Sequence, residues 1–415
     1  MRLLYCFLVL FGLLISNAPA FGQESSAVDP QVQAFAEHVA ELIKQGDPKA
    51  IEAVCDIKYD FRQIAGDTEF HFQDKEKWIQ SLTEKAKLLP PLHTPLLFPE
   101  QTVESCQLIS VRKVKDSHLA IERVFTDDGT LTYLWLTISP KEAGSFAVVA
   151  CESTLSGGEI SAFIRMLLTR YAPWETPDGM ISDQAENAPA LSLEKRYVYG
   201  MLQALKKMDL LSVTQLYMQL PPEIQDLQSQ PLIAMVALQS ALKLNEVAQS
   251  QQIEGLKQFS ANTIQRAVQQ CPKSPSIAFY SWDWFLENGQ PDVALEQLQV
   301  LKQEIGNDPY LALNEAEVLV AKGETQEGYE LVKQAMKSLG DIQTCYLIAA
   351  SIYARGGDYK STTHWLEQAE IKFDTKYHLD DLSDTAWKSF IESREYQEWQ
   401  SKSSKPAAGD ESSEP

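Results

Sequence analysis

The 415-residue sequence has few basic residues, few histidines and few cysteines. It carries 36 Lys and Arg against 57 Asp and Glu, which gives a formal net charge of −21. An acidic surface of this size repels phosphate backbones and anionic lipid headgroups, so nucleic acid is set aside as a partner. The six histidines do not cluster. His38 and Glu41 share a predicted helix face at metal-ligand spacing, but two ligands do not make a metal site, and we interpret this face as solvated.

Long apolar runs are also missing after the first 22 residues, since none approaches the roughly 18 residues needed to span a bilayer. The start of the chain has Arg2, an apolar run over 3–15, and small residues that offer cleavage sites near Ala20 or Gly22. This pattern is typical of a secretory signal. We therefore expect residues 1–22 to be cleaved and the protein to be exported, either to a periplasm or fully secreted.

Five cysteines would remain after that cleavage, which is too few for a disulfide framework. An odd number leaves at least one thiol free or bonded between chains. Cys106 and Cys151 lie in predicted strands of one sheet, so they are the intradomain disulfide to test. Alternatively, all five are small buried apolar residues.

Breaks in composition divide the chain into segments. The signal segment 1–22 precedes a predicted α+β domain over 23–172. A stretch rich in Pro, Gly, Asp and Asn, 173–192, interrupts all periodicity and is interpreted as a linker. A helical domain follows over 193–400, and the polar tail 401–415 is expected to be disordered.

The predicted α+β domain begins with helices and continues with strands. Helical spacing of apolar residues covers 32–43, 48–62 and 74–88, and β-branched and aromatic runs cover 103–114, 118–125, 131–138 and 146–151. Gly129 closes a hairpin after two aspartates. Ser156 and Glu159 have the spacing of a capping box and predict a helix to Arg170. This order of elements, with a four-stranded antiparallel sheet, resembles the cone-shaped nuclear transport factor-like and cystatin-like folds.

The helical domain contains an internal repeat. Gly289, Gly323 and Gly357 stand 34 residues apart, which defines units at 275–308, 309–342 and 343–376. Helices that pack closely need small residues at the contact, and the second helix of each unit carries one at the same position: Ala294, Gly328 and Thr362.

These residues, which recur every 34 positions, closely resemble the pattern of the tetratricopeptide repeat family. Gly357-Asp358-Tyr359 is the most typical fragment of that pattern here. The resemblance implies antiparallel helix pairs stacked into an α-solenoid. Degenerate helices at 197–207, 211–220 and 232–244 would extend the array upstream, and 383–391 with 396–400 would cap it. The expected fold is therefore mainly α, with an N-terminal α+β domain followed by a tetratricopeptide-like solenoid.

The resemblance also implies a concave groove lined by the first helix of each unit. Members that bind chaperones clamp a carboxylate there with Lys, Arg and Asn, whereas only Arg355 has that character here. An apolar and acidic groove better suits an amphipathic or basic segment, or the chain's own N-terminal domain. Ordinary solvated and core positions are the alternative interpretation. The residues carried over by position are Phe279, Asp283, Leu286, Glu287, Tyr310, Leu313, Glu317, Val320, Thr344, Leu347, Ser351 and Arg355.

No pattern predicts catalysis, a cofactor or a metal. We therefore expect a non-enzymatic exported scaffold with a protein or peptide partner, and self-association through the concave face is open. The alternative is a small-ligand-binding or catalytic N-terminal cone that the repeats support. Its candidate polar groups are Asp56, Tyr59, Asp60, Glu122 and Tyr133.

Overall fold

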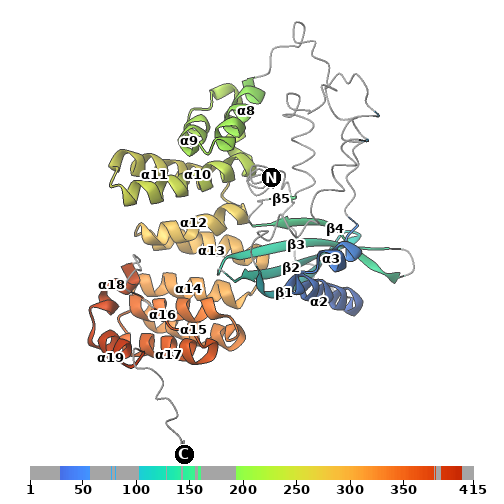
Figure 1. The fold of residues 1–415 in the computed structure, drawn as a ribbon. Helices are drawn as coiled ribbons and strands as arrows, with labels where there is room; N and C mark the ends of the chain where they lie inside the picture. The colour runs from blue at the N-terminus through green and yellow to red at the C-terminus, as the bar shows by residue number, and fades with distance from the viewer. Residues whose placement is uncertain are drawn as a thin grey trace, which may run out of the picture. The chain divides into compact units, whose positions relative to one another are not determined.

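The computed structural model describes residues 29–56, 76, 80, 102–127, 129–141, 144–154, 158–159, 193–377, 379 and 385–403. Over these residues the chain is mostly helical, and an antiparallel sheet precedes a helical region (Figure 1). The chain divides into two compact units, Met1–Ser281 and Trp282–Pro415. The predicted signal segment and linker lie outside the described residues, as do nearly all of the predicted helices at 74–88 and 156–170 and most of the tail.

Helix α2 (Pro30–Gln45) has sequence signals at both ends. The Asp29 side chain accepts a hydrogen bond from the Gln31 amide at 2.9 Å, which satisfies one of the free donors at the helix start. Gly46 follows the last turn in the left-handed conformation. Between these ends, one stripe of the helix is buried at the helical spacing: Val32, Ala36, Val39, Ala40, Leu42 and Ile43.

Helix α3 (Pro48–Val54) is shorter than the predicted helix over 48–62, so that prediction was wrong about where the helix ends. After Val54 the backbone joins the sheet. Cys55 forms an isolated parallel bridge with Val148, and the Asp56 amide donates to the Val148 carbonyl at 2.8 Å. This pairing with a distant strand takes the amide away from helical hydrogen bonding.

The sheet is a meander in which each strand pairs with the next one along the chain. The four predicted strands are confirmed within two residues at each end. Gly129 adopts a φ of 82° at the turn between the second and third strands, as the predicted hairpin requires. The strands are β1 (Val103–Val114), β2 (Ser117–Thr126), β3 (Leu131–Pro140), β4 (Phe146–Ser153) and β5 (Gly158–Glu159).

Strand β5 corrects the predicted capping box. Glu159 pairs with Glu152, and Gly158 pairs with Ser153, so Glu159 lies in a sheet and not in the first turn of a helix. The spacing of Ser156 and Glu159 is a local signal, and the pairing with β4 overrides it.

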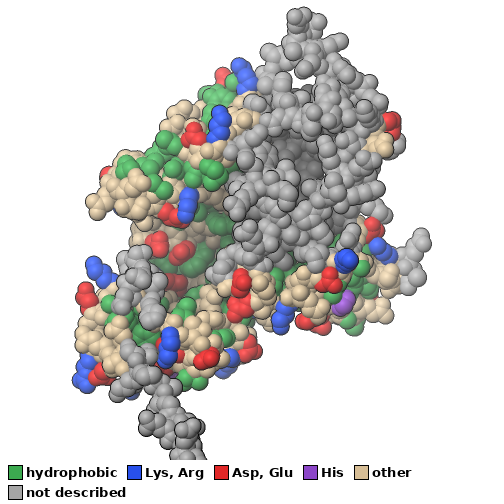
Figure 2. Space-filling view, viewed as in Figure 1, with side chains coloured by type: hydrophobic (Ala, Val, Ile, Leu, Met, Phe, Trp, Pro, Cys, Tyr) green, Lys and Arg blue, Asp and Glu red, His purple; other side chains and the backbone are tan. Residues whose placement is uncertain are grey.

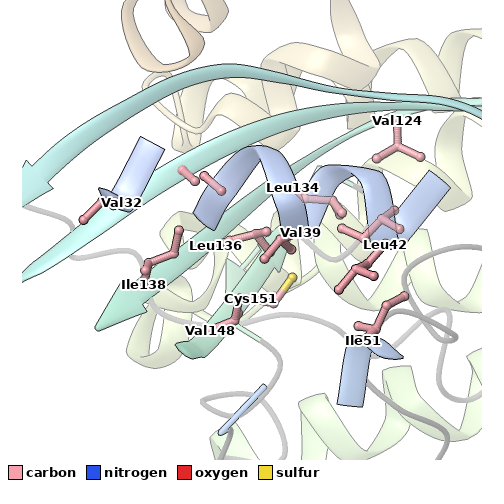
Figure 3. Packing of buried hydrophobic residues seen from close by; sticks show 13 residues of the cluster. Val32, Val39, Leu42, Ile51, Val124, Leu134, Leu136, Ile138, Val148 and Cys151 are labelled. Carbon is pink, nitrogen blue, oxygen red and sulfur yellow. The ribbon is translucent and has the colours of Figure 1, made fainter. Parts of the chain in front are cut away.

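An apolar core fills the space between α2, α3 and one face of the sheet. Side chains from α2 point at strand residues such as Val124, Leu136 and Ile138 (Figure 3). Each fully buried Val, Leu or Ile contributes about 1.5–3 kcal/mol through removal from water, so this layer is the main stabilising contact of the α+β part.

The predicted disulfide between Cys106 and Cys151 is wrong. Cys106 lies in β1 and Cys151 in β4, with β2 and β3 between them. Neighbouring strands are about 4.8 Å apart, so the two Cα atoms are well beyond the reach of a disulfide. The five cysteines among the described residues form no disulfides, and each is buried or partly buried.

The helical region begins in the first unit and continues in the second. The first unit contains α8 (Leu193–Lys206), α9 (Leu210–Met218), the 3-10 helix η3 (Pro222–Ser229), α10 (Pro231–Ser250) and α11 (Glu254–Gln270). Helix α12 (Pro275–Glu287) crosses the boundary between the units. The second unit contains α13 (Pro291–Ile305), α14 (Pro309–Ala321), α15 (Thr325–Leu339), α16 (Gln343–Arg355), α17 (Tyr359–Phe373), α18 (Thr385–Ile391) and α19 (Arg394–Ser403).

Helix bounds recur with the predicted period of 34 residues. Helices α12, α14 and α16 start at Pro275, Pro309 and Gln343, and each has 13 residues. Their successors α13, α15 and α17 each have 15 residues and keep the same step. The predicted starts of the three units are therefore the observed helix starts.

One backbone turn joins the two helices of every pair from α8 to α17. A residue in the left-handed region, with φ between 56° and 88°, is followed by an amide that donates to the carbonyl five residues earlier, at 2.8–3.0 Å. This is the hydrogen bond of the Schellman motif. The left-handed residue is glycine in the last three turns but Met208 and Gln252 in the first two. These residues are Met208, Gln252, Gly289, Gly323 and Gly357.

The predicted small contact positions are buried, as expected. Ala294 and Thr362 are fully buried. At Gly328, an added Cβ would stand 2.6 Å from Val320 Cγ2 and 2.8 Å from the Ala316 carbonyl oxygen. Since both of these neighbours belong to α14, the space between α14 and α15 admits no side chain at this position.

Candidate functional site

The predicted groove residues are three or four positions apart on α14 and α16, and Phe279, Asp283 and Glu287 are four apart on α12, so each of these sets follows one helix face. Leu286, the other predicted residue of α12, is buried with 4% exposure. Asp283 and Glu287 on α12 are exposed. Phe279, on the same helix, belongs to the first unit and contacts the sheet there. Its ring meets the ring of Tyr133 edge-on, with centroids 6.2 Å apart.

Two of the predicted residues are brought together as an ion pair. Helices α14 and α16 pack against each other, and Arg355 Nη2 donates to Glu317 Oε1 at 3.0 Å. The side chains retain only 17% and 12% of their exposure. A guanidinium already paired with a carboxylate on the neighbouring helix is less available to bind an incoming carboxylate.

Tyr310 lies beside this pair. Burial raises the pKa of its hydroxyl, and the nearby Cys345, Glu317, Asp283 and Asp308 raise the pKa further. The acidic side chains named by the sequence, Asp283 and Glu317, therefore surround a buried phenol. The surroundings of this hydroxyl stabilise its neutral form, which makes it a hydrogen-bonding group and not a base.

Two neighbours of Tyr310 escaped the sequence argument. Asp308 caps α14, where its carboxylate accepts from the Tyr310 amide at 3.3 Å. Its position directly before Pro309 is a recognisable start signal, and that signal could have placed it near the groove. Cys345 is fully buried on α16 and has no local signature.

The remaining groove residues have structural contacts. Leu313 is 0% exposed and belongs to the core. Leu347 packs against the aromatic cluster of the last helices, which includes Trp387, Phe390 and Trp399. The Ser351 hydroxyl donates to the Ile348 carbonyl at 2.8 Å, within its own helix.

Charges of both signs are scattered over the described helices on the face seen in Figure 2, between apolar patches. Among the predicted groove residues of the second unit, three carboxylates stand against one guanidinium. Counted formally, the Glu317–Arg355 pair is neutral and Asp283 and Glu287 add two negative charges to these predicted positions.

Glu122, one of the polar groups suggested for an N-terminal pocket, is buried in the core of the α+β part. Glu122 on β2 is 0% exposed, and its Oε2 accepts a hydrogen bond from the Cys106 thiol at 3.4 Å. Its Oε1 has no hydrogen-bond partner among the described residues. Burial raises the pKa of the carboxyl to about 8, against the small opposing effect of the thiol.

The polar groups suggested for an N-terminal pocket do not converge. Glu122 shares a face with the residues that pack on α2, while Tyr133 is on the opposite face and contacts Phe279. Asp56 forms an ion pair with Lys141 at 3.2 Å. Tyr59 and Asp60 lie outside the described residues.

Metal ligands and membrane spans were also sought over the described part of the chain. No group of three or more His, Cys, Asp and Glu there could hold a metal ion. His38 and Glu41 are both exposed, and Glu41 accepts a hydrogen bond from Gln45 at 3.0 Å. None of the described helices combines the length and the apolarity that crossing a bilayer requires.

Comparison of the chain with protein-family models, with curated proteins and with solved structures finds no match in any of the three.

Proposed function

We propose that the chain is an exported, non-enzymatic scaffold of the cell envelope that binds a protein or peptide partner through a tetratricopeptide-like α-solenoid. The observation that carries this proposal is the shared turn of five consecutive helix pairs, three of which also share helix bounds at a 34-residue step. A helix pair of this kind cannot bury its apolar face alone, so it stacks on its neighbours.

The two upstream pairs support the extension of this array. Neither α8–α9 nor α10–α11 has glycine at the turn, yet both make the same backbone hydrogen bond as the later pairs. Helix α10 packs against α9 and against α11. Stacking by neighbours along the chain is the arrangement that an α-solenoid requires.

The groove chemistry favours a basic or amphipathic partner segment. Asp283 and Glu287 are exposed on α12, and Arg355 is engaged by Glu317. A partner with Lys or Arg side chains would gain electrostatic complementarity at this face, mainly in association rate and specificity. A segment with a terminal carboxylate would meet net negative charge.

The test is a pull-down from an envelope extract with the full mature chain, followed by mass spectrometry. Asp283→Lys combined with Glu287→Lys reverses the charge of the face at exposed positions that the fold tolerates. Glu327→Lys combined with Glu392→Lys makes the same change in charge at exposed positions elsewhere in the second unit. A protein that the first variant loses and the second retains supports the proposal. Equal retention by all three proteins contradicts it.

A second function is favoured by one observation, the buried Glu122 carboxyl with its raised pKa. Groups perturbed in this way concentrate at functional sites. The alternative is therefore a small-ligand-binding or catalytic N-terminal domain of the cone-like type. Native mass spectrometry of the mature chain tests it, because a copurifying small molecule that Glu122→Gln no longer retains would favour this alternative.

A further inference from the structure

The central strands of the sheet are buried on both faces. Residues such as Val124 and Leu134 face α2 (Figure 3). Their sequence neighbours point to the opposite face, because side chains alternate along a strand. That second face is also buried, with exposures of 0–6%, and consists of Ile121, Arg123, Phe125, Tyr133 and Trp135. A sheet buried on both faces needs a covering layer on each.

Helix α12 supplies an aromatic contact to the second face. The ring planes of Tyr133 and Phe279 are at 89° with centroids 6.2 Å apart, which is the favourable edge-to-face geometry. Phe279 is also edge-on to Tyr280, with centroids 5.2 Å apart. All three residues belong to the first unit.

One charged side chain of the second face, Arg123, is bonded within the sheet. Arg123 donates to the Gln107 side chain and lies 5.7 Å over the Phe125 ring. The indole Nε1 of Trp135 on the same face is buried without a hydrogen-bond partner among the described residues, so the contact with the covering layer here is mainly apolar and aromatic.

We propose that α12 binds this second face of the sheet and that the contact between Tyr133 and Phe279 anchors the two elements. Phe279 is therefore bound by the chain's own sheet. The consequence for a ligand rests on the proposed function. A partner that binds at Phe279 has to displace the Tyr133 ring from it.

Hydrogen–deuterium exchange of the full mature chain tests the contact without any partner, so its outcome is independent of whether the repeats bind one. Tyr133→Ala should speed exchange of the α12 amides several-fold, and Phe279→Ala should speed exchange of the β3 amides. The matched control is Phe35→Ala. Phe35 packs on Phe146 on the α2 side, with centroids 5.9 Å apart, and its loss should leave α12 unchanged.

Three outcomes overturn the proposal. The proposal is contradicted if the α12 amides of Tyr133→Ala exchange at the wild-type rate. It is also contradicted if the β3 amides of Phe279→Ala exchange at the wild-type rate. Equal loosening of α12 by Tyr133→Ala and Phe35→Ala shows general destabilisation in place of a specific anchor. Should Tyr133→Ala fail to fold, Phe279→Ala still decides the question, because it alters a helix and is read out in the sheet.

Discussion

The Cys106 thiol donates a hydrogen bond to the Glu122 carboxyl across neighbouring strands, at 3.4 Å, inside the core that α2 covers. A thiol is a weak donor, so it compensates little of the cost of burying a carboxylate. The pair is therefore compatible with the folded core mainly while Glu122 carries its proton. Among the described residues, Glu41 on α2 and Arg123 on β2 are the other charged groups that act on the Cys106 thiol.

The first prediction concerns pH. The pKa of Glu122 is raised from 4.5 to about 8 in the folded state, so the folded state keeps a proton that the unfolded state loses. The stabilisation is fully present below about pH 4.5 and is lost as the pH rises through about 8. Since one pKa unit corresponds to about 1.4 kcal/mol, the total is on the order of 5 kcal/mol.

Urea unfolding at several pH values between 5 and 9 measures this loss. The glutamine in Glu122→Gln cannot ionise. The free energy of unfolding of the α+β part should therefore depend less on pH in this variant than in the wild type. Glu37→Gln, at an exposed position of α2, should keep the wild-type profile. Parallel profiles for Glu122→Gln and the wild type would show that this carboxyl is not the titrating group.

The second prediction concerns the contact between α14 and α15. Gly328→Leu would force atoms into Val320 and the Ala316 carbonyl and should destabilise the second unit by about 1–3 kcal/mol, seen as a lower melting temperature. Gly255 is the control, because a Cβ there meets nothing within 4 Å. Gly255→Leu should leave the melting temperature unchanged or slightly raised. An unchanged melting temperature for Gly328→Leu would contradict the helix packing described above.

The third prediction concerns the ion pair between α14 and α16. Arg355→Met leaves the Glu317 carboxylate without its guanidinium partner and should cost about 3 kcal/mol, whereas adding Glu317→Gln should recover part of the loss. A double-mutant cycle should give a coupling energy of about 1–3 kcal/mol. The exposed pair Arg394–Glu398 is the control and should show no measurable coupling. Additive effects at Arg355 and Glu317 would argue against a coupled pair.

The fourth prediction concerns the turns. Met208 adopts a φ of 57° with a side chain that is 60% exposed, so Met208→Gly relieves backbone strain and loses little packing. It should stabilise the first unit by a few tenths to about 1 kcal/mol. Gly323→Met is the reciprocal change at a φ of 88° and should cost about 1–2 kcal/mol, since no atom crowds its Cβ. The denaturant midpoints of both variants check these two expectations. A loss of stability in Met208→Gly would contradict the argument from backbone strain.

Local signals predicted most of the elements. Pro275 and Pro309 stand at helix starts, and Gly289, Gly323 and Gly357 occupy left-handed turns, because each residue has a backbone preference that acts within a few positions. Strand positions followed in the same way from β-branched and aromatic runs.

What was missed depends on contacts between distant residues. Cys55 and Asp56 leave the helix because Val148, more than 90 positions later, offers a backbone partner. The sheet order separates Cys106 from Cys151, and Glu159 differs from these cases because its strand partner Glu152 is only seven positions away. For the candidate site, the 34-residue repeat was enough to predict which helices carry the groove residues and at which positions. The Glu317–Arg355 pair and the burial of Glu122 could not be predicted, because charged residues at those positions give no sign of what packs over them.

The neighbour-only pairing of the strands has a kinetic consequence. Each of β1 to β4 pairs with the strand that follows it, across a turn of a few residues, and each helix pair closes through one short turn. Contacts between residues close in sequence cost little loop-closure entropy, so proteins rich in such contacts fold faster. The hairpins of the described sheet can therefore form one after another, in the order in which they occur along the chain.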